Sequence, residues 1–165
     1  MKNLSPHSLI FFLFFMAGSC GAEITGKVID AETQQPIEGA LILVEWTIAK
    51  GLPGMSQTEP HEIEEVLSKK DGSFKIKTYL NPFLDNPRIT IYKKAYVAWN
   101  NEYIFPGWTK RDKFELRDGM SIRLEPFKKE YSRADHVSFL NSITHWGKQI
   151  GKAYRWEELE KEQNR

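Results

Sequence analysis

The stretch that decides the fold is ITGKVIDAETQQPIEGA, residues 24–40, followed by the apolar run Leu41–Val44. Pro36 presets a backbone angle that suits a turn, and Gly39 can adopt the angles needed to leave that turn. Runs of apolar and β-branched residues flank this polar centre on both sides, as strands do. The segment therefore predicts a strand, a polar turn and a second strand.

Further strands follow this hairpin and are separated by turn signals. Asp71-Gly72 can supply the positive backbone angles of a tight hairpin, and Phe74 and Ile76 after it share one face of a strand. By periodicity alone, His61–Ser68 fits a helical turn as well as a strand, and the hairpin that follows favours the strand. We expect seven strands: Ile24–Asp30, Ala40–Ile48, His61–Ser68, the one with Phe74 and Ile76, Arg88–Lys94, one within Glu102–Phe105, and one within Ser121–Pro126.

Four motifs, in this order, resemble the carboxypeptidase regulatory-like domain, a small transthyretin-like β-sandwich. They are the opening hairpin, an Asp-Gly-x-Phe match at Asp71–Phe74, a partial match to Lys-Gly-Tyr at Lys94–Tyr96, and a Leu-x-Pro ending at Leu124–Pro126. The resemblance covers Ile24–Pro126 and implies an all-β fold, a seven-stranded Greek-key β-sandwich over residues 20–126. Where such domains stand beside a peptidase they serve folding or interaction, so the resemblance also implies a non-catalytic role.

The residues ahead of the hairpin have the pattern of an export signal. Leu9–Met16 is an unbroken apolar block, and the small residues Ala17–Ser19 follow it. At about 1.5 Å per helical residue, this block reaches only about half of a roughly 30 Å hydrocarbon core, so it is too short to span a membrane. We expect residues 1–19 to be a signal peptide.

Two processing routes compete at the end of this signal. The sequence AGSC, residues 17–20, resembles a bacterial lipobox, although that motif usually has Leu where Ala17 stands. The sequence CGA, residues 20–22, instead suits ordinary signal cleavage before Glu23. We favour the first route, because the single cysteine lies where a lipid-carrying residue would be. Cys20 is then an acylated amino terminus that anchors the protein in a membrane, facing the periplasm, whereas the second route gives a soluble periplasmic or secreted protein.

Composition excludes one class of partner. The signal peptide carries one of the 23 basic side chains and none of the 22 acidic ones, so the remaining chain is neutral. A neutral chain lacks the electrostatic footprint of a protein that binds nucleic acid. Because the chain has a single cysteine, no internal disulfide can form, and the core must be held by burial.

Beyond residue 126 the periodicity becomes helical. Ser132 can cap a helix in which Val137, Leu140, Ile143 and Trp146 recur along one face. We expect residues 127–165 to be a helical extension whose apolar stripe packs on the sandwich, because exposed apolar stripes are rare on monomers. The alternative is that the stripe binds a groove on a partner protein.

No motif indicates catalysis or a bound metal. His61, His136 and His145 remain after export, and none has a second ligand at metal spacing. We expect each to be satisfied by hydrogen bonds or exposed to solvent. No Gly-x-Ser-x-Gly elbow is present, and the acidic residues Glu62 and Glu64 are expected on a solvated strand face. We therefore predict no catalytic residue, no metal and no cofactor.

The one candidate binding surface is a dense run of aromatic residues between positions 92 and 108. Alternation along the fifth strand places Ile89 and Ile91 in the core and Tyr92 outside. Tyr and Trp offer a flat apolar face with a polar edge, which suits sugar rings and peptides alike. The candidate ligand-binding residues are therefore Tyr92, Trp99 and Trp108, and the ordinary alternative is that these rings fill the core.

Together these patterns predict an exported, lipid-anchored, non-catalytic binding or structural module at the cell envelope, with an envelope protein or a glycan as its partner. The first alternative is a carbohydrate-binding module that uses the exposed aromatic residues. The second is a small envelope hydrolase, which requires a cleft with at least two convergent titratable groups.

Overall fold

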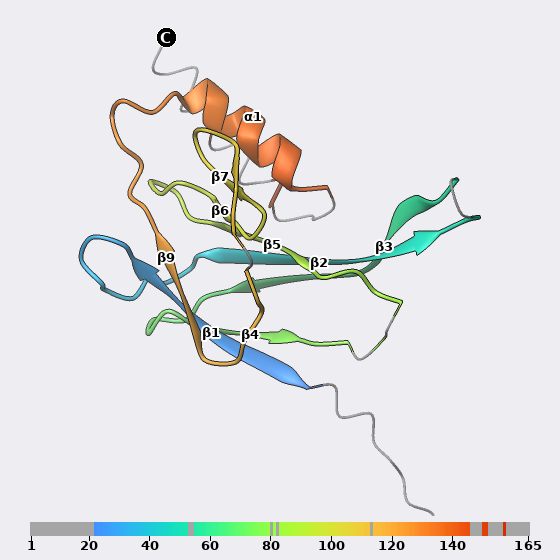
Figure 1. Cartoon of the computed structure of the whole chain (residues 1–165). Helices are drawn as coiled ribbons and strands as arrows, with labels where there is room; N and C mark the ends of the chain where they lie inside the picture. Colours follow the sequence, from blue (N-terminus) through green and yellow to red (C-terminus); the bar gives the residue numbers. More distant parts are fainter. Residues whose placement is uncertain are drawn as a thin grey trace, which may run out of the picture.

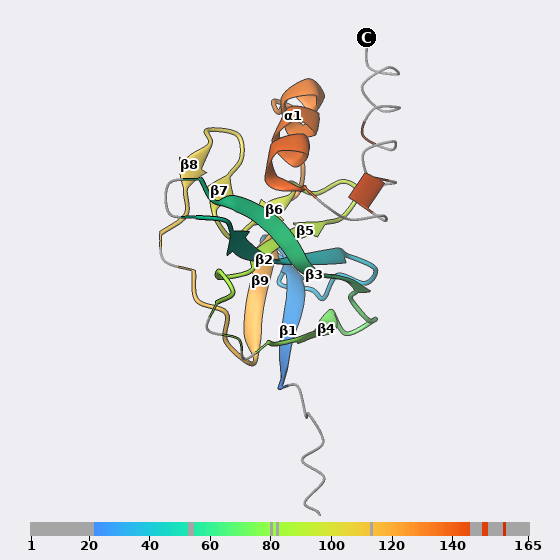
Figure 2. The same cartoon turned by 90° about the vertical axis from the view of Figure 1, so that its right-hand side faces the viewer.

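The computed structural model describes residues 22–52, 55–79, 81, 83–112, 114–145, 150, 151 and 157. These residues form three layers: a three-stranded sheet, a four-stranded sheet stacked on it, and a helix on the outer side of the four-stranded sheet (Figures 1 and 2). The predicted signal peptide, Cys20 and Trp146 lie outside the described residues. Within the described part of the chain, no helix is long and apolar enough to cross a membrane.

The three-stranded sheet has the order β4-β1-β9. Its central strand β1 pairs antiparallel with β4, where Ile24 lies opposite Ile76, and parallel with β9, where Val28 lies opposite Ile122. The strands therefore bring the two ends of the sandwich sequence side by side. Their bounds are Glu23–Asp30 for β1, Ser73–Lys77 for β4 and Met120–Leu124 for β9.

The four-stranded sheet has the order β3-β2-β5-β6, and all of its pairs are antiparallel. The first two strands form a long hairpin that projects from one end of the molecule (Figure 1). Two further short strands, β7 and β8, make a separate ribbon. The bounds are Leu41–Lys50 for β2, Gln57–Leu67 for β3, Arg88–Tyr92 for β5, Trp99–Asn100 for β6, Tyr103–Ile104 for β7 and Thr109–Lys110 for β8.

The inner core lies between the two sheets and follows the alternation of their strands. Gly26 of β1 stands beneath the ring of Phe74, and a Cβ at position 26 would come within 2.4 Å of the Phe74 Cζ atom. The glycine thus makes room for the Phe74 ring in this core. The buried side chains of this inner core are Val28, Ile37, Ala40, Ile42, Val44, Trp46, Phe74, Ile76, Ile89, Ile91, Ile122 and Leu124.

The Asp71-Gly72 turn has the backbone that the sequence predicts. Gly72 has φ +74°, a left-handed conformation that favours glycine. The Val28 amide donates a 2.9 Å hydrogen bond to the Gly72 carbonyl, and a Cβ at Gly72 would lie 2.4 Å from the Val28 carbonyl oxygen. The turn therefore needs glycine both for its backbone angle and for its closeness to β1.

Helix α1, Arg133–Ile143, covers the outer face of the four-stranded sheet (Figure 2). The side chain of Ser132 accepts a 3.2 Å hydrogen bond from the Asp135 amide, which confirms the predicted cap. The packing of the helix on the sandwich is also confirmed, because its apolar side chains are buried in one cluster with side chains from β2, β5 and the segment 97–105. This outer core contains Leu41, Leu43, Tyr92, Val97, Ala98, Phe105, Phe139, Leu140, Ile143 and Ile150.

The all-β sandwich with a C-terminal helix is confirmed, and seven strands make up the two stacked sheets within the described residues. The strand predicted within Glu102–Phe105 is present as β7, but it belongs to the separate ribbon and not to the sandwich. The strand that completes the four-stranded sheet is β6 at Trp99–Asn100. The reason is local. The Asn100 side-chain oxygen accepts hydrogen bonds from the amides of Glu102 and Tyr103, at 2.8 and 2.9 Å, which turn the chain away from the sheet.

Candidate binding groove between β6 and β9

The edges of the two sheets meet at one end and separate at the other. At the meeting point the Val97 amide donates to the Glu125 carbonyl at 2.8 Å, and the Phe127 amide donates to the Ala95 carbonyl at 2.9 Å. Beyond this point β6 pairs with β5 while β9 pairs with β1. Each is the last strand of its sheet in the described structure. A wedge therefore opens between the two strand edges.

This wedge is a groove with a volume of about 440 Å³. One wall comes from β6 and the segments that follow it, and the other comes from β9. Apolar side chains form most of the lining, and four polar or charged residues join them. The lining residues are Val97, Ala98, Trp99, Ile104, Phe105, Arg111, Phe114, Met120, Ser121, Ile122, Arg123 and Glu125.

Trp99, Phe114 and Arg111 form the first wall. The rings of Trp99 and Phe114 meet edge to face, with centroids 5.2 Å apart, and the guanidinium carbon of Arg111 lies 4.8 Å from the centroid of the Trp99 ring. The Arg111 Nε donates a 2.9 Å hydrogen bond to the Asn100 carbonyl. Burial lowers the pKa of Arg111 from its usual value, yet an arginine side chain keeps its charge in proteins. The wall thus combines aromatic rings with a fixed cation.

The second wall is the free edge of β9. Backbone groups alternate in direction along a strand, so every second residue points to the same side. The Leu124 carbonyl accepts from Ala31 on the β1 side, and the Glu125 carbonyl accepts from Val97 on the outer side. By this alternation Ser121 and Arg123 direct their peptide groups outward, where the described residues place no neighbouring strand. The edge therefore offers hydrogen-bonding groups to an added strand.

A second hollow continues the groove towards the β7–β8 ribbon. It has a volume of about 430 Å³ and shares Arg111 and Phe114 with the first. Polar side chains dominate its lining. Its remaining lining residues are Asn86, Pro87, Asn101, Glu102, Tyr103 and Lys110.

The structure separates the three predicted aromatic residues. Trp99 is half-buried in the groove. Trp108 is 44% exposed and packs edge to face on Phe139 of α1, with ring centroids 5.1 Å apart, and it does not line the groove. A ligand contact by Trp99 or Trp108 stays a prediction.

The prediction that Tyr92 is exposed to solvent is wrong. The ring does lie on the opposite face of β5 from Ile89 and Ile91, as alternation predicts, but the C-terminal segment covers that face. Tyr92 is buried, and its hydroxyl donates a 2.9 Å hydrogen bond to Glu157 Oε1. A ring buried in this way cannot form part of an exposed binding surface.

The three histidines do not converge. His136 is fully buried, and its Nε2 accepts a 2.9 Å hydrogen bond from the Ala98 amide. Its Nδ1 lies 3.3 Å from Glu157 Oε2. His145 Nδ1 is 2.8 Å from a guanidinium nitrogen of Arg88, and His61 is exposed beside Tyr79. Among the described residues, no group of three His, Cys, Asp or Glu side chains could hold a metal ion.

Sequence reasoning missed most of the groove. Trp99 was found because aromatic residues stand out, whereas Arg111 and Phe114 belong to no motif. The one available signal was a basic residue three positions after Trp108, just beyond the aromatic run. The sequence does not show that β9 has a free edge, because whether a strand lies at the edge of a sheet depends on which other strands pair with it in the folded protein.

Comparison with known proteins gives no family. No protein-family model matches the chain, and no curated protein matches it. Among solved structures it is similar to the shaft pilin SpaA of Lactobacillus rhamnosus GG, with 14% identity over 66% of this chain and 47% of that one, at a TM-score of 0.37. The chain thus spans about half the length of that pilin, and it covers 97% of a structure of the pilin's C-terminal domain, at 16% identity and a TM-score of 0.36.

A third similar structure is an enzyme. Hydroxyquinol 1,2-dioxygenase from Pseudomonas putida matches with 13% identity over 77% of this chain and 68% of its own, at a TM-score of 0.38. Scores this low, shared by pilins and an enzyme, assign neither a family nor an activity to this chain.

Proposed function

We propose that this protein is an exported, non-catalytic binding module of the bacterial cell envelope, held at the membrane by an acyl chain on Cys20. The sandwich corresponds to the carboxypeptidase regulatory-like domain that the sequence motifs resemble. Its partner is another envelope protein. The observation that carries the binding role is the open wedge between β6 and β9, with its free strand edge.

The groove suits an extended, acidic segment of a partner protein. Such a segment would pair with the outward peptide groups of Ser121 and Arg123 and so add a strand to the three-stranded sheet. Alternate side chains of the segment would enter the apolar lining next to Trp99 and Met120. Arg111 and Arg123 supply positive charge along the path, and Glu125 is the one carboxylate in the lining. Charge therefore favours an acidic segment over a basic one.

The geometry supports this role better than the two alternatives. A sugar ring needs the open face of an aromatic ring, and the Trp99 ring already has Arg111 over one face and the edge of Phe114 against it. A hydrolase needs at least two convergent titratable groups. Glu125 is engaged elsewhere, because it pairs with Lys128 and accepts a hydrogen bond from the Tyr131 hydroxyl at 2.9 Å.

A charge reversal on the groove tests the binding role. The probes are two extended peptides that alternate valine with glutamate or valine with lysine, and binding is read from tryptophan fluorescence of the mature chain. We expect the acidic peptide to bind the natural protein more tightly than the basic one. In the variant Arg123→Glu, which changes an exposed residue, the basic peptide should bind more tightly than the acidic one. The matched control is Arg117→Glu, which is also exposed and lies outside the groove.

Two results would contradict the proposal. One is equal affinity of both peptides in all three proteins. The other is binding of oligosaccharides that neither substitution changes while neither peptide binds, which would favour the carbohydrate-binding alternative.

The lipid anchor has a direct test. Mass spectrometry of protein extracted from membranes should find a diacyl or triacyl modification on Cys20. A mature chain that begins at Glu23 and stays in the soluble fraction would refute the anchor.

A further inference from the structure

The most exposed large apolar side chains of the described structure are Phe83, Met55 and Leu52, which are 78%, 74% and 67% exposed. The next one, Leu67, is 56% exposed. Exposed apolar residues are common singly, and a cluster of them marks a surface that contacts something else. Whether these three side chains lie together therefore decides whether they form a contact surface.

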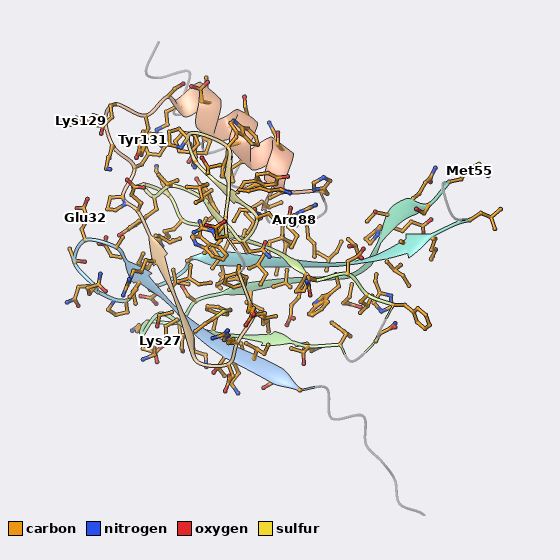
Figure 3. All side chains as sticks on the ribbon, in the orientation of Figure 1. Lys27, Glu32, Met55, Arg88, Lys129 and Tyr131 are labelled. Carbon is orange, nitrogen blue, oxygen red and sulfur yellow. The ribbon has the colours of Figure 1, made fainter. Side chains whose placement is uncertain are left out.

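All three lie at the projecting end of the β2–β3 hairpin. The last pair of this hairpin is Lys50 with Gln57, and Leu52 and Met55 stand in the turn beyond it, closed by a 2.9 Å hydrogen bond from the Met55 amide to the Leu52 carbonyl. Figure 3 shows Met55 at the far tip. Leu67 is at the opposite end of β3, about 30 Å away by strand length.

Phe83 reaches the same end from another segment. Leu84 forms a bridge with Ile48, and the Asp85 amide donates to the Thr47 carbonyl at 3.0 Å. The chain around Phe83 therefore runs antiparallel along the last part of β2, which places Phe83 beside the residues that precede the tip. Two segments, far apart in sequence, thus present apolar side chains at one end.

The start of the sandwich faces the same side. Figure 1 shows β1 beginning on the side of the molecule towards which the hairpin projects, and Figure 2 looks at that side directly. The Thr78 amide and hydroxyl both donate to the Ala22 carbonyl, at 2.8 and 2.6 Å, which fixes the start of β1 to the end of β4. Cys20 is three residues before Glu23, a span of at most about 10 Å. An acyl chain on Cys20 would therefore hold this side against the bilayer.

We infer that this end is a membrane-docking surface, in which Leu52, Met55 and Phe83 enter the interface of a lipid bilayer. The inference rests on the acylated Cys20 of the proposed function. Apolar contacts, and not charge attraction, would drive insertion here. The nearest charged residues on the hairpin, Lys50 and Glu59, neutralise each other in a 2.7 Å ion pair. A short lipid anchor gains residence time when apolar side chains enter the same leaflet. Docking would also hold the sandwich in one orientation.

A single-thiol label tests the inference. In the acylated chain the Cys20 sulfur carries lipid, so Met55→Cys provides the one free thiol. This thiol takes an environment-sensitive fluorophore, and the protein is bound to vesicles of phosphatidylcholine and phosphatidylethanolamine. We expect a blue shift and strong quenching by lipid-attached quenchers. The matched control is Glu32→Cys, an exposed position on the opposite side of the molecule (Figure 3), where neither change should occur.

A second measurement uses the rate at which the acylated protein transfers between vesicles. The triple variant Leu52→Ser, Met55→Ser, Phe83→Ser should transfer at least several-fold faster than the natural protein, and Leu67→Ser should transfer at the natural rate. Acylated protein whose label at position 55 stays as exposed to water as the label at position 32 overturns the docking inference and leaves the anchor intact. Mass spectrometry that finds no acyl group on Cys20 overturns both.

Discussion

The inner core and the outer core lie on opposite faces of one sheet and are built differently. The inner core consists of apolar side chains from strands and their turns. The outer core mixes apolar residues with buried polar groups, because Glu45, Thr90, His136 and Glu157 are all at most 1% exposed. The side chains of the inner core thus contact one another through apolar surface, whereas the side chains of the outer core also make hydrogen bonds and charge contacts with one another.

These polar contacts tie the C-terminal segment to the sheet at defined points. Thr90 donates its hydroxyl to the Ile143 carbonyl at 3.3 Å, and the Ala98 amide donates to His136. Glu157 accepts from Tyr92 and lies 3.2 Å from a guanidinium nitrogen of Arg133. A purely apolar interface could slide, whereas hydrogen bonds of this kind fix one position of the helix. The outer core is therefore the more sensitive of the two to single polar changes.

The largest effect is expected from removing the outer layer altogether. A chain truncated after Pro126 uncovers Leu41, Leu43 and Tyr92, and each large side chain contributes roughly 1.5–3 kcal/mol when buried. We expect the truncated chain to aggregate or to melt at a clearly lower temperature. Thermal denaturation and size-exclusion chromatography measure both.

The opposite outcome has a definite meaning. If the truncated chain stays monomeric and melts at the temperature of the full mature chain, the helix does not belong to the folding unit, and the partner-groove alternative takes its place. A smaller version of the test is Leu140→Ala, with an expected cost of about 2–5 kcal/mol.

The next effect concerns the buried carboxylate of the outer core. Burial alone would raise the pKa of Glu157, but the His136 ring nitrogen 3.3 Å away, the hydrogen bond from the Tyr92 hydroxyl and the charge of Arg133 hold it below the usual value. Glu157→Gln removes the anion from beside these groups and should cost roughly 3–5 kcal/mol of unfolding free energy. Urea denaturation at neutral pH measures this cost.

The pH dependence of this cost follows from the lowered pKa. A carboxyl group whose pKa is lower in the folded state stabilises that state above its unfolded pKa, and the contribution is lost as pH falls through the folded pKa. The difference between the natural protein and Glu157→Gln should therefore shrink below about pH 4.5, the ordinary value for glutamate. A difference that stays constant down to about pH 2 would mean that Glu157 contributes by shape alone.

The smallest effect lies in a turn that borders the inner core. Gly72→Val forces a branched side chain into a left-handed backbone and against the Val28 carbonyl oxygen, which should cost on the order of 1–3 kcal/mol. Gly119→Val is the control for backbone strain, because Gly119 has φ +71° and nothing lies within 4 Å of an added Cβ. Thermal melting should show a larger loss for Gly72→Val. Equal losses would mean that the contact with β1 adds nothing.

Little of the candidate groove could be predicted, and the reason is physical. Trp99 was identified by residue type, but its neighbours Arg111 and Phe114 carry no local pattern. Their meeting depends on where Asn100 turns the chain and on where residues 125–127, which follow β9, pair with residues 95–97. A turn signal has a local cause, whereas a groove is the space left by several segments together.

The sequence by itself determined the strands and turns of the inner core. Pro36, Asp71-Gly72 and the alternation of Phe74 with Ile76 act over a few residues, so their consequences appear in the chain before any tertiary contact forms. Tertiary structure decided which strand faces were finally covered. Tyr92 became buried because Glu157, 65 residues away, bonds to it, and His136 became a core residue because the Ala98 amide, 38 residues away, needs an acceptor. Contacts across such separations depend on how whole layers stack, and no local pattern encodes that.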